Sequence, residues 1–407
     1  MNESEKLTTI LADFRNNTVV RACAGSGKTR LLAAKYLTAL LWHGDPKGLA
    51  AITFTEKAAQ ELKSRIQDFL SRIAQAHSQD TLMSATDLPW AQVRAALDKL
   101  QIPGMKTGDF PAMQQRAAKL SRLLTAGAGA IGTIHGFAGR LLDAYPMEAT
   151  DGLLTRFDPS GRTILEMLDD SSSEETVTLT QTFEKTSYRQ AAALIRELFE
   201  SAKRGFDIEH AVSFDAAASG KDLSALWPRL SGLVRGVIAA SRQEGRLDYD
   251  LMLYWLNVFL KNADDATLSD VQGRARYILL DELQDTDPLQ FEILTRLCAT
   301  PMPQKARVSG DWKNLTLAQG RIFMVGDPFQ SIYSFRGACP QLAFGQVAAR
   351  SFTAWDLLGN KRSGPKILGF VNHIFGACGQ DYQPMQSTAD KSGLPDDVLW
   401  HTTMPQA

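Results

Sequence analysis

Three segments of this chain carry residues whose types and spacing suit phosphate chemistry. The first is Gly25-Ser-Gly-Lys28-Thr29. Its glycines would let backbone N–H groups turn toward phosphate oxygens, and the helix expected after them adds its positive N-terminal end. Lys28 would then reach the β- and γ-phosphates, and the Thr29 hydroxyl would hold Mg²⁺. A strict phosphate-binding loop begins with Gly where this chain has Ala22, so a glycine-rich turn with an exposed lysine is the alternative.

The second segment is the acidic run Leu280-Asp281-Glu282-Leu-Gln-Asp285, which follows an apolar stretch. Asp281 is suited to the metal that Thr29 would share, and Glu282 to taking a proton from attacking water. The alternative is a solvated acidic strand end. Asp281 lies 253 residues after Lys28, so both can belong to one nucleotide-binding domain only if a large insertion separates them.

The third segment, Val325-Gly-Asp-Pro-Phe-Gln330-Ser-Ile-Tyr333-Ser-Phe335-Arg336, interleaves an amide, aromatic rings and a cation. Gln330 could sense a γ-phosphate. Tyr333, Phe335 and Arg336 offer stacking planes and a positive charge to single-stranded nucleic acid. The alternative is that these aromatic rings belong to the core beside a surface arginine.

The elements that must position these residues have an α/β rhythm. Short apolar runs, each followed by polar residues, predict strands at 18–22, 48–55, 129–134, 277–280, 321–325 and near 353–358. Runs without alternation suit a parallel sheet covered by helices on both faces, where ligands bind at the carboxyl ends of the strands. Helical patterns are expected at 30–42, from 56, over 76–128, at 138–145 and at 188–203.

Composition limits the protein classes. The 407 residues are 44% hydrophobic with a net charge of −1, so two or three domains are expected, and any nucleic-acid contact must be local. Four scattered cysteines argue against a zinc site or disulfide framework. The polar N-terminus and the lack of a long apolar run predict neither a signal peptide nor a membrane span, hence a cytoplasmic protein.

Six ordered motifs resemble superfamily 1 DNA helicases of the UvrD/RecB type. They are Ala22-Cys-Ala-Gly-Ser-Gly-Lys-Thr, Thr53-Phe-Thr-Glu-Lys-Ala-Ala-Gln-Glu-Leu, Gly132-Thr-Ile-His-Gly-Phe, Leu280-Asp-Glu-Leu-Gln-Asp-Thr-Asp-Pro-Leu-Gln, Val325-Gly-Asp-Pro-Phe-Gln-Ser-Ile-Tyr-Ser-Phe-Arg-Gly-Ala and Asn360-Lys-Arg-Ser. Within this family, Tyr145-Pro-Met-Glu-Ala and Gly245-Arg-Leu-Asp-Tyr-Asp-Leu are most like the N-terminal part of AddA proteins, helicase–nuclease subunits of bacterial double-strand-break repair enzymes.

The resemblance implies ATP and Mg²⁺ as cofactors and a RecA-like P-loop domain. It implies catalytic roles for Lys28, Glu282, Gln330 and Arg362, the last stabilising charge on the transferring phosphoryl group. It gives metal binding to Thr29 and Asp281. Nucleotide contacts would come from Ala22, Cys23, Ala24, Gly25, Ser26, Gly27, Lys28, Thr29, Arg30, Gln330 and Arg362, and DNA contacts from Phe54, Thr55, Thr133, His135, Tyr333, Phe335 and Arg336.

The chain departs from the family pattern at three places. The region before Ala22 contains no glutamine to read adenine, and Lys361 stands where an aromatic residue usually stacks on the base, so base preference could be loose. Ala407 follows Arg362 by only 45 residues, too few for a second motor lobe and a nuclease domain. The expected plan is motor domain at 1–75, 129–145 and 271–370, helical insertions at 76–128 and 146–270, and the start of a second lobe or a linker at 371–407.

The resemblance implies ATP-dependent 3′–5′ unwinding of DNA ends in double-strand-break repair, in the bacterial cytoplasm at the nucleoid. It also implies a nuclease and an AddB-like partner protein, and no membrane. Alternatives are a nucleotide-dependent module that binds single-stranded DNA without unwinding it, and a stand-alone UvrD-type repair helicase. A P-loop kinase or GTPase is a third class, disfavoured by the aromatic tail after Gln330.

Overall fold

The computed structural model describes residues 2–78, 82, 90–102, 109–146, 156–157, 246–247, 249–377 and 382–388. At its centre is a six-stranded, wholly parallel sheet in the order β3-β2-β6-β7-β1-β8. The strands are β1 (Thr18–Ala22), β2 (Leu49–Thr53), β3 (Ala130–Thr133), β6 (Tyr277–Leu280), β7 (Ile322–Gly326) and β8 (Thr353–Leu357). This confirms the expected α/β class, and the expected helix at 188–203 lies outside the described residues.

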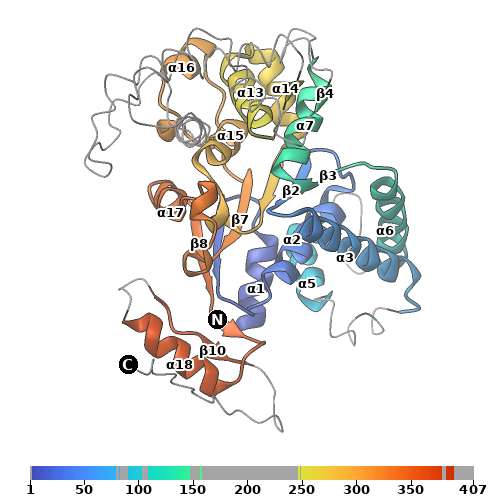
Figure 1. Ribbon diagram of the computed structural model, residues 1–407. Coiled ribbons are helices and arrows are strands. Elements are labelled where there is room, and N and C mark those ends of the chain that lie inside the picture. The colour runs from blue at the N-terminus through green and yellow to red at the C-terminus, as the bar shows by residue number, and fades with distance from the viewer. Residues whose placement is uncertain are drawn as a thin grey trace, which may run out of the picture.

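Helices cover both faces of the sheet (Figure 1). Successive strand residues point to opposite faces, so Ile278 and Leu280 of β6 enter one core while Tyr277 and Leu279 enter the other. The first core includes residues of α7 (Ile134–Ala144), α13 (Tyr249–Asn262), α14 (Asp265–Arg274), α15 (Pro288–Cys298) and α17 (Pro340–Ala348). The second includes residues of α1 (Glu3–Ala12), α2 (Lys28–His43), α3 (Glu56–Gln75), α5 (Trp90–Leu100) and α6 (Phe110–Thr125).

Helices α5 and α6 come from the 76–128 stretch, yet they share the second core with α2 and α3. Trp90 and Val93 of α5 and Leu120 of α6 are fully or almost fully buried there. These two helices therefore belong to the helical layer that covers this face of the sheet. Polar residues of α5 and α6 can for that reason lie beside residues of α1, α2 and α3.

The N-terminal helix α1 is held against the sheet by a buried lysine of α2. The ammonium group of Lys35 donates to the carbonyl oxygens of Ile10, Leu11 and Asp13 at 2.9, 3.2 and 2.7 Å, and it lies 3.6 Å from the centre of the Phe14 ring. The last carbonyls of a helix have no partner within it. Lys35 supplies their donors and so fixes where α1 ends beside the first strand.

Because every strand of the sheet is parallel, all six carboxyl ends lie at one edge. The glycine-rich loop follows β1, Phe54 follows β2, Asp281 follows β6 and Asp327 follows β7. The expected gathering of the motifs at one edge is therefore confirmed by the topology.

One local expectation needs correction, and one pairing was not expected. The helix expected at 138–145 begins at Ile134, because Thr133 at the end of β3 accepts a hydrogen bond from Gly136 N and caps the helix. The Asn360 motif lies partly in a short strand, β9 (Gly359–Asn360), which pairs with β10 (Gln386–Ser387) across 25 residues of sequence. Strands of two residues are too short to show the alternating pattern of side chains by which a strand is predicted from sequence.

The remaining described elements are shorter or lie away from the sheet. They are the strand pair β4 (Arg156–Phe157) and β5 (Arg246–Leu247), the helices α16 (Gln304–Ser309) and α18 (Pro365–Gly376), and the 3₁₀ turns η2 (Leu283–Asp285), η3 (Trp312–Asn314), η4 (Pro328–Gln330) and η5 (Ser334–Arg336). Among the described helices, none is long and apolar enough to cross a membrane.

Candidate active site

The glycine-rich loop joins β1 to α2 with the backbone shape that phosphate binding needs. Gly25 and Gly27 have φ values of +71° and +94°, in the left-handed region that favours glycine. The Ser26 hydroxyl closes the loop by donating to the Cys23 carbonyl oxygen at 2.7 Å. Burial, the largest cause, raises the pKa of the Cys23 thiol to about 11, so this thiol is neutral at pH 7 and serves as a small apolar residue.

Lys28, the first residue of α2, belongs to a closed ring of hydrogen bonds that joins four side chains to the side chain and backbone N–H of Asp327. Its ammonium group lies 2.9 Å from Glu282 Oε2 and 2.9 Å from Gln330 Oε1. Gln330 Nε2 donates to Asp327 Oδ2 at 2.6 Å, and Asp327 N donates to Gln284 Oε1 at 2.9 Å. Gln284 Nε2 completes the ring by donating to Glu282 Oε2 at 2.7 Å. The ring therefore unites the loop after β1 with those after β6 and β7.

Glu282 has a backbone conformation that is uncommon for its residue type. Its φ of +51° places a non-glycine residue in the left-handed region, and such strain is stored preferentially at functional sites. Its side chain nevertheless remains 33% exposed while the carboxylate is paired with Lys28. Glu282 is thus aimed at Lys28 and is still open to solvent, as a proton acceptor for water must be.

The carboxylates around Glu282 share one strongly negative region. Burial, followed by the charge of Glu282, raises the pKa of Asp281 to about 6, and the Lys28 ammonium opposes that rise. The same causes in the same order raise the pKa of Asp285 to about 6. Two carboxylates that resist ionisation in this way would gain from a bound cation.

The predicted magnesium ligands Thr29 and Asp281 would leave most of the coordination positions to the substrate and to water. Thr29 is half-buried in the first turn of α2, and Asp281 is 7% exposed directly after β6. Within the described ranges, no group of three or more His, Cys, Asp or Glu side chains could hold a metal by itself. Mg²⁺ usually binds through one or two protein groups together with phosphate oxygens and waters, and the donor set here is of that kind.

Arg362 is held against the glycine-rich loop by its neighbour Asn360. Asn360 Nδ2 donates to Ala24 O at 2.6 Å, and Asn360 Oδ1 accepts from the backbone N–H groups of Arg362 and Ser363 at 2.8 and 2.7 Å. Lys361 N donates to Gly25 O at 2.9 Å. A Cβ atom on Gly25 would lie 2.8 Å from Arg362 Cβ, so glycine is required for this close approach.

Three of the expected nucleic-acid residues come together on the same edge of the sheet. The rings of Phe54, after β2, and Tyr333, after η4, have centroids 4.6 Å apart and are tilted by 33°. The Arg336 guanidinium carbon lies 5.5 Å from the centre of the Tyr333 ring. Tyr333 follows Gln330 closely in the chain, so the aromatic pair is directly linked to the Lys28 ring.

The other expected nucleic-acid residues are placed differently. The Thr55 and Thr133 hydroxyls cap α3 and α7, and Thr133 Oγ1 also donates to Glu56 Oε1 at 2.7 Å. His135 lies within α7, with its ring centroid 5.0 Å from that of Tyr249. The side chain of Phe335 lies outside the described part of the molecule. The DNA-contact roles of these residues stay predictions.

Sequence reasoning missed three members of the site. Gln284 and Asp327 link the loops after β6 and β7, and Asn360 fixes the segment that carries Arg362. All three lie inside the quoted motifs, so their positions were a signal. Their roles depend on contacts between segments that are distant in the sequence, and such contacts cannot be predicted from residue type alone.

Comparison with known proteins supplies independent findings. A family model described as the UvrD/REP helicase N-terminal domain matches residues 1–345. The chain is 24% identical to the RecBCD enzyme component RecB of Mycobacterium tuberculosis over 326 residues, covering 79% of this chain and 26% of that protein. It is 26% identical to DNA helicase II of Haemophilus influenzae over 364 residues, covering 88% of this chain and 38% of the relative.

A third relative is an ATP-dependent helicase/nuclease protein of Staphylococcus carnosus, with 32% identity over 204 residues. That match covers 44% of this chain and 15% of the relative. In these three comparisons the chain spans well under half of each relative's length.

Proposed function

Since the chain belongs to the UvrD/REP helicase family and has its RecA-like α/β domain, we propose that it is the ATP-binding part of a DNA helicase motor. The observation that carries this proposal is the closed ring in which Lys28 contacts both Glu282 and Gln330 at 2.9 Å. A lysine at a phosphate-binding loop, a carboxylate and an amide are the groups that P-loop enzymes use to hold a γ-phosphate and its attacking water.

In the proposed reaction, the backbone N–H groups of residues 25–29 and the Lys28 ammonium bind the β- and γ-phosphates. Phosphate oxygens replace Glu282 and Gln330 as partners of Lys28. Glu282 then accepts the proton of the attacking water, and Gln330 orients the γ-phosphate. The Arg362 guanidinium stabilises the charge on the transferring group. Mg²⁺, held by Thr29 and Asp281, would neutralise phosphate charge when bound.

Coupling to nucleic acid follows from the chain connection between Gln330 and Tyr333. If Gln330 leaves Lys28 for the γ-phosphate, the loop that carries Tyr333 and Arg336 must adjust. Stacking on Phe54 and Tyr333 would therefore differ between nucleotide states, which is how a motor of this class grips and releases a single strand.

The names of the relatives extend the proposal. The S. carnosus relative is by name a helicase and nuclease, and RecB is by name part of the RecBCD enzyme. The proposal also includes what the resemblance of the motifs implies, namely 3′–5′ unwinding of DNA ends, double-strand-break repair with an AddB-like partner, and a bacterial cytoplasmic, nucleoid-associated location. A stand-alone repair helicase is favoured instead by the broad match to DNA helicase II.

The test is Mg-ATP hydrolysis by the chain with and without single-stranded DNA, compared with Lys28→Ala and with Lys47→Ala, an exposed lysine after α2. We expect Lys28→Ala to abolish turnover and Lys47→Ala to leave it unchanged. ATP binding that depends on Lys28 without turnover would indicate a nucleotide-dependent DNA-binding module. Neither binding nor turnover would refute the assigned site.

A further inference from the structure

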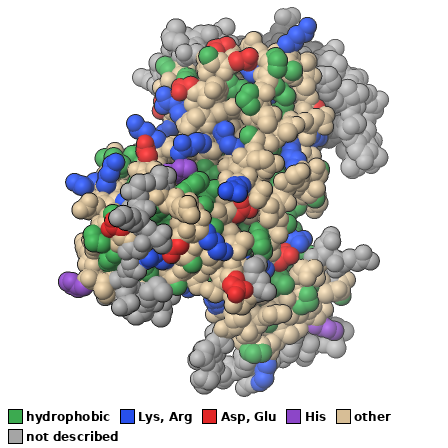
Figure 2. Space-filling view, turned by 180° about the vertical axis from the view of Figure 1, so that it is seen from behind, with side chains coloured by type: hydrophobic (Ala, Val, Ile, Leu, Met, Phe, Trp, Pro, Cys, Tyr) green, Lys and Arg blue, Asp and Glu red, His purple; other side chains and the backbone are tan. Residues whose placement is uncertain are grey.

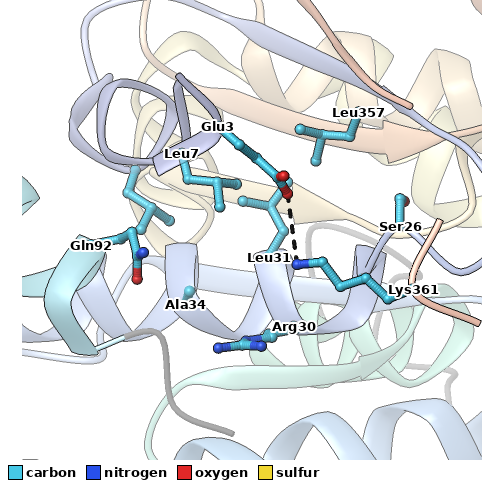
Figure 3. Close-up of a pocket in the computed structure, with 11 residues that line it drawn as sticks. Glu3, Leu7, Ser26, Arg30, Leu31, Ala34, Gln92, Leu357 and Lys361 are labelled. Carbon is cyan, nitrogen blue, oxygen red and sulfur yellow. Dashed lines mark ion pairs between the residues drawn. The ribbon is translucent and has the colours of Figure 1, made fainter. Parts of the chain in front are cut away.

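A pocket opens beside the glycine-rich loop, between α1, α2, α5 and the end of β8 (Figure 3). Ser26 and Gly27 of the loop form part of its lining. Most of the remaining lining is apolar, and it comes from Leu7, Leu11, Leu31, Ala34 and Leu357. Four polar side chains also line it, namely Glu3, Arg30, Gln92 and Lys361.

The position of the pocket indicates its ligand. Phosphates bound at the start of α2 would have Gly27 and Ser26 as neighbours, and the group attached to those phosphates would extend into the adjoining space. Leucine and alanine walls suit the flat apolar face of a nucleobase. A base also carries hydrogen-bonding groups on its edge, so a site that distinguishes bases needs a polar side chain in the wall.

Gln92 meets that need from an unexpected element. It lies on α5, whose residues Trp90, Val93, Ala96 and Leu97 are buried. Gln92 is adjacent to that buried face and only half-buried, and its Nε2 donates to Ser4 Oγ of α1 at 3.2 Å. That bond uses one of the two N–H donors of the amide, so the carbonyl oxygen and the other N–H can serve a ligand.

We propose that Gln92 is the base-reading residue of this chain and that it selects adenine. A glutamine amide matches the N6 donor and N7 acceptor of adenine with two hydrogen bonds. Guanine offers two acceptors, O6 and N7, on the same edge, and one of them would face the amide oxygen. This inference rests on the proposed function, because it takes the phosphates of the nucleotide to be bound by Lys28.

The rim of the pocket is closed by an ion pair between Glu3 and Lys361. The two charged groups lie 3.6 Å apart and join α1 to the segment after β8, as the dashed line in Figure 3 shows. Both side chains are about half exposed, and exposed pairs contribute little to stability. The pair can therefore open for an entering base. No aromatic ring is among the described side chains that line the pocket, so discrimination falls to the amide.

The test is calorimetric titration of the chain with ATP, GTP and inorganic tripolyphosphate. Gln92→Leu keeps the size of the side chain and removes the amide. Gln115→Leu makes the same change at an exposed position of α6 and is the control. We expect the wild type and the control to prefer ATP over GTP, and Gln92→Leu to weaken ATP binding by about tenfold or more. Tripolyphosphate affinity should be the same in all three proteins.

An equal preference of the wild type for ATP and GTP, or an unchanged preference in Gln92→Leu, would overturn the role of Gln92. In either case tripolyphosphate binding that is lost in Lys28→Ala would leave the proposed function intact. If neither ATP nor tripolyphosphate binds, both the pocket assignment and the proposed function fail.

Discussion

In the nucleotide-free protein, the ionised form of Asp281 is destabilised by burial and by the neighbouring charge of Glu282. Its raised pKa, about 6, means that the folded state holds a proton in a pH range where the unfolded chain has lost it. Stability from this group is therefore present at acidic pH and declines as the pH rises from about 4 through 6. Above pH 6 the carboxylate of Asp281 is ionised, and a bound cation would offset the cost of its burial.

We predict that Asp281→Asn stabilises the nucleotide-free chain above pH 6. With the pKa raised from 3.8 to about 6 and 1.36 kcal/mol per pKa unit, the gain is about 3 kcal/mol at pH 8 and falls to well under 1 kcal/mol near pH 4. Urea unfolding at both pH values measures it, with the exposed Asp68→Asn as control. A gain of equal size at both pH values would contradict this account. The same variant should lose Mg²⁺-dependent ATP binding.

At the scale of elements, the turn after β9 depends on one side chain. Asn360 makes three short hydrogen bonds, one of them to the glycine-rich loop. We predict that Asn360→Ala destabilises the fold by about 2 kcal/mol and lowers ATP turnover by about tenfold or more, because the backbone that carries Arg362 is no longer fixed.

The matched control for that variant is Asn372→Ala. Asn372 Oδ1 accepts from Tyr382 Oη and Met385 N at 2.6 and 2.9 Å, and Nδ2 donates to Met385 O at 2.9 Å. Its loss also removes three hydrogen bonds, but they lie between α18 and the segment that leads into β10. Steady-state ATPase assays and thermal unfolding compare the two variants. Equal loss of turnover in both would show that Asn360 acts only through stability.

The elements also show what the sequence could predict. Apolar runs followed by polar residues identified the strands, because a buried parallel strand must be apolar on both faces. Motif order singled out Lys28, Glu282 and Gln330, and the structure brings these three side chains together. The local sequence gave no sign that Gln92 lies near the glycine-rich loop, because this position results from the packing of α5 on α1. The predicted start of α7 was wrong, because Thr133 is both the last residue of β3 and the N-cap of the helix.

For the whole molecule, a net charge of −1 gives no general attraction to DNA. On the face in Figure 2, Lys and Arg side chains are spread over the middle of the molecule with Asp and Glu among them. The proposed binding of a single strand would therefore depend on local contacts, and the Phe54–Tyr333 pair with Arg336 is the best-defined group among the predicted contacts.

We predict that Tyr333→Ala and Phe54→Ala each weaken binding of a fluorescent single-stranded oligonucleotide by about 1–3 kcal/mol, the contribution of one stacked base. Trp312→Ala is the control, since Trp312 is also half-buried and lies 6.0 Å from its ring partner Phe291. Arg336→Ala should lower the salt dependence of binding, because one phosphate contact fewer releases fewer counterions. If Tyr333→Ala binds as tightly as the Trp312→Ala control, the rings pack only on each other, and the single strand must follow another path across this edge of the sheet.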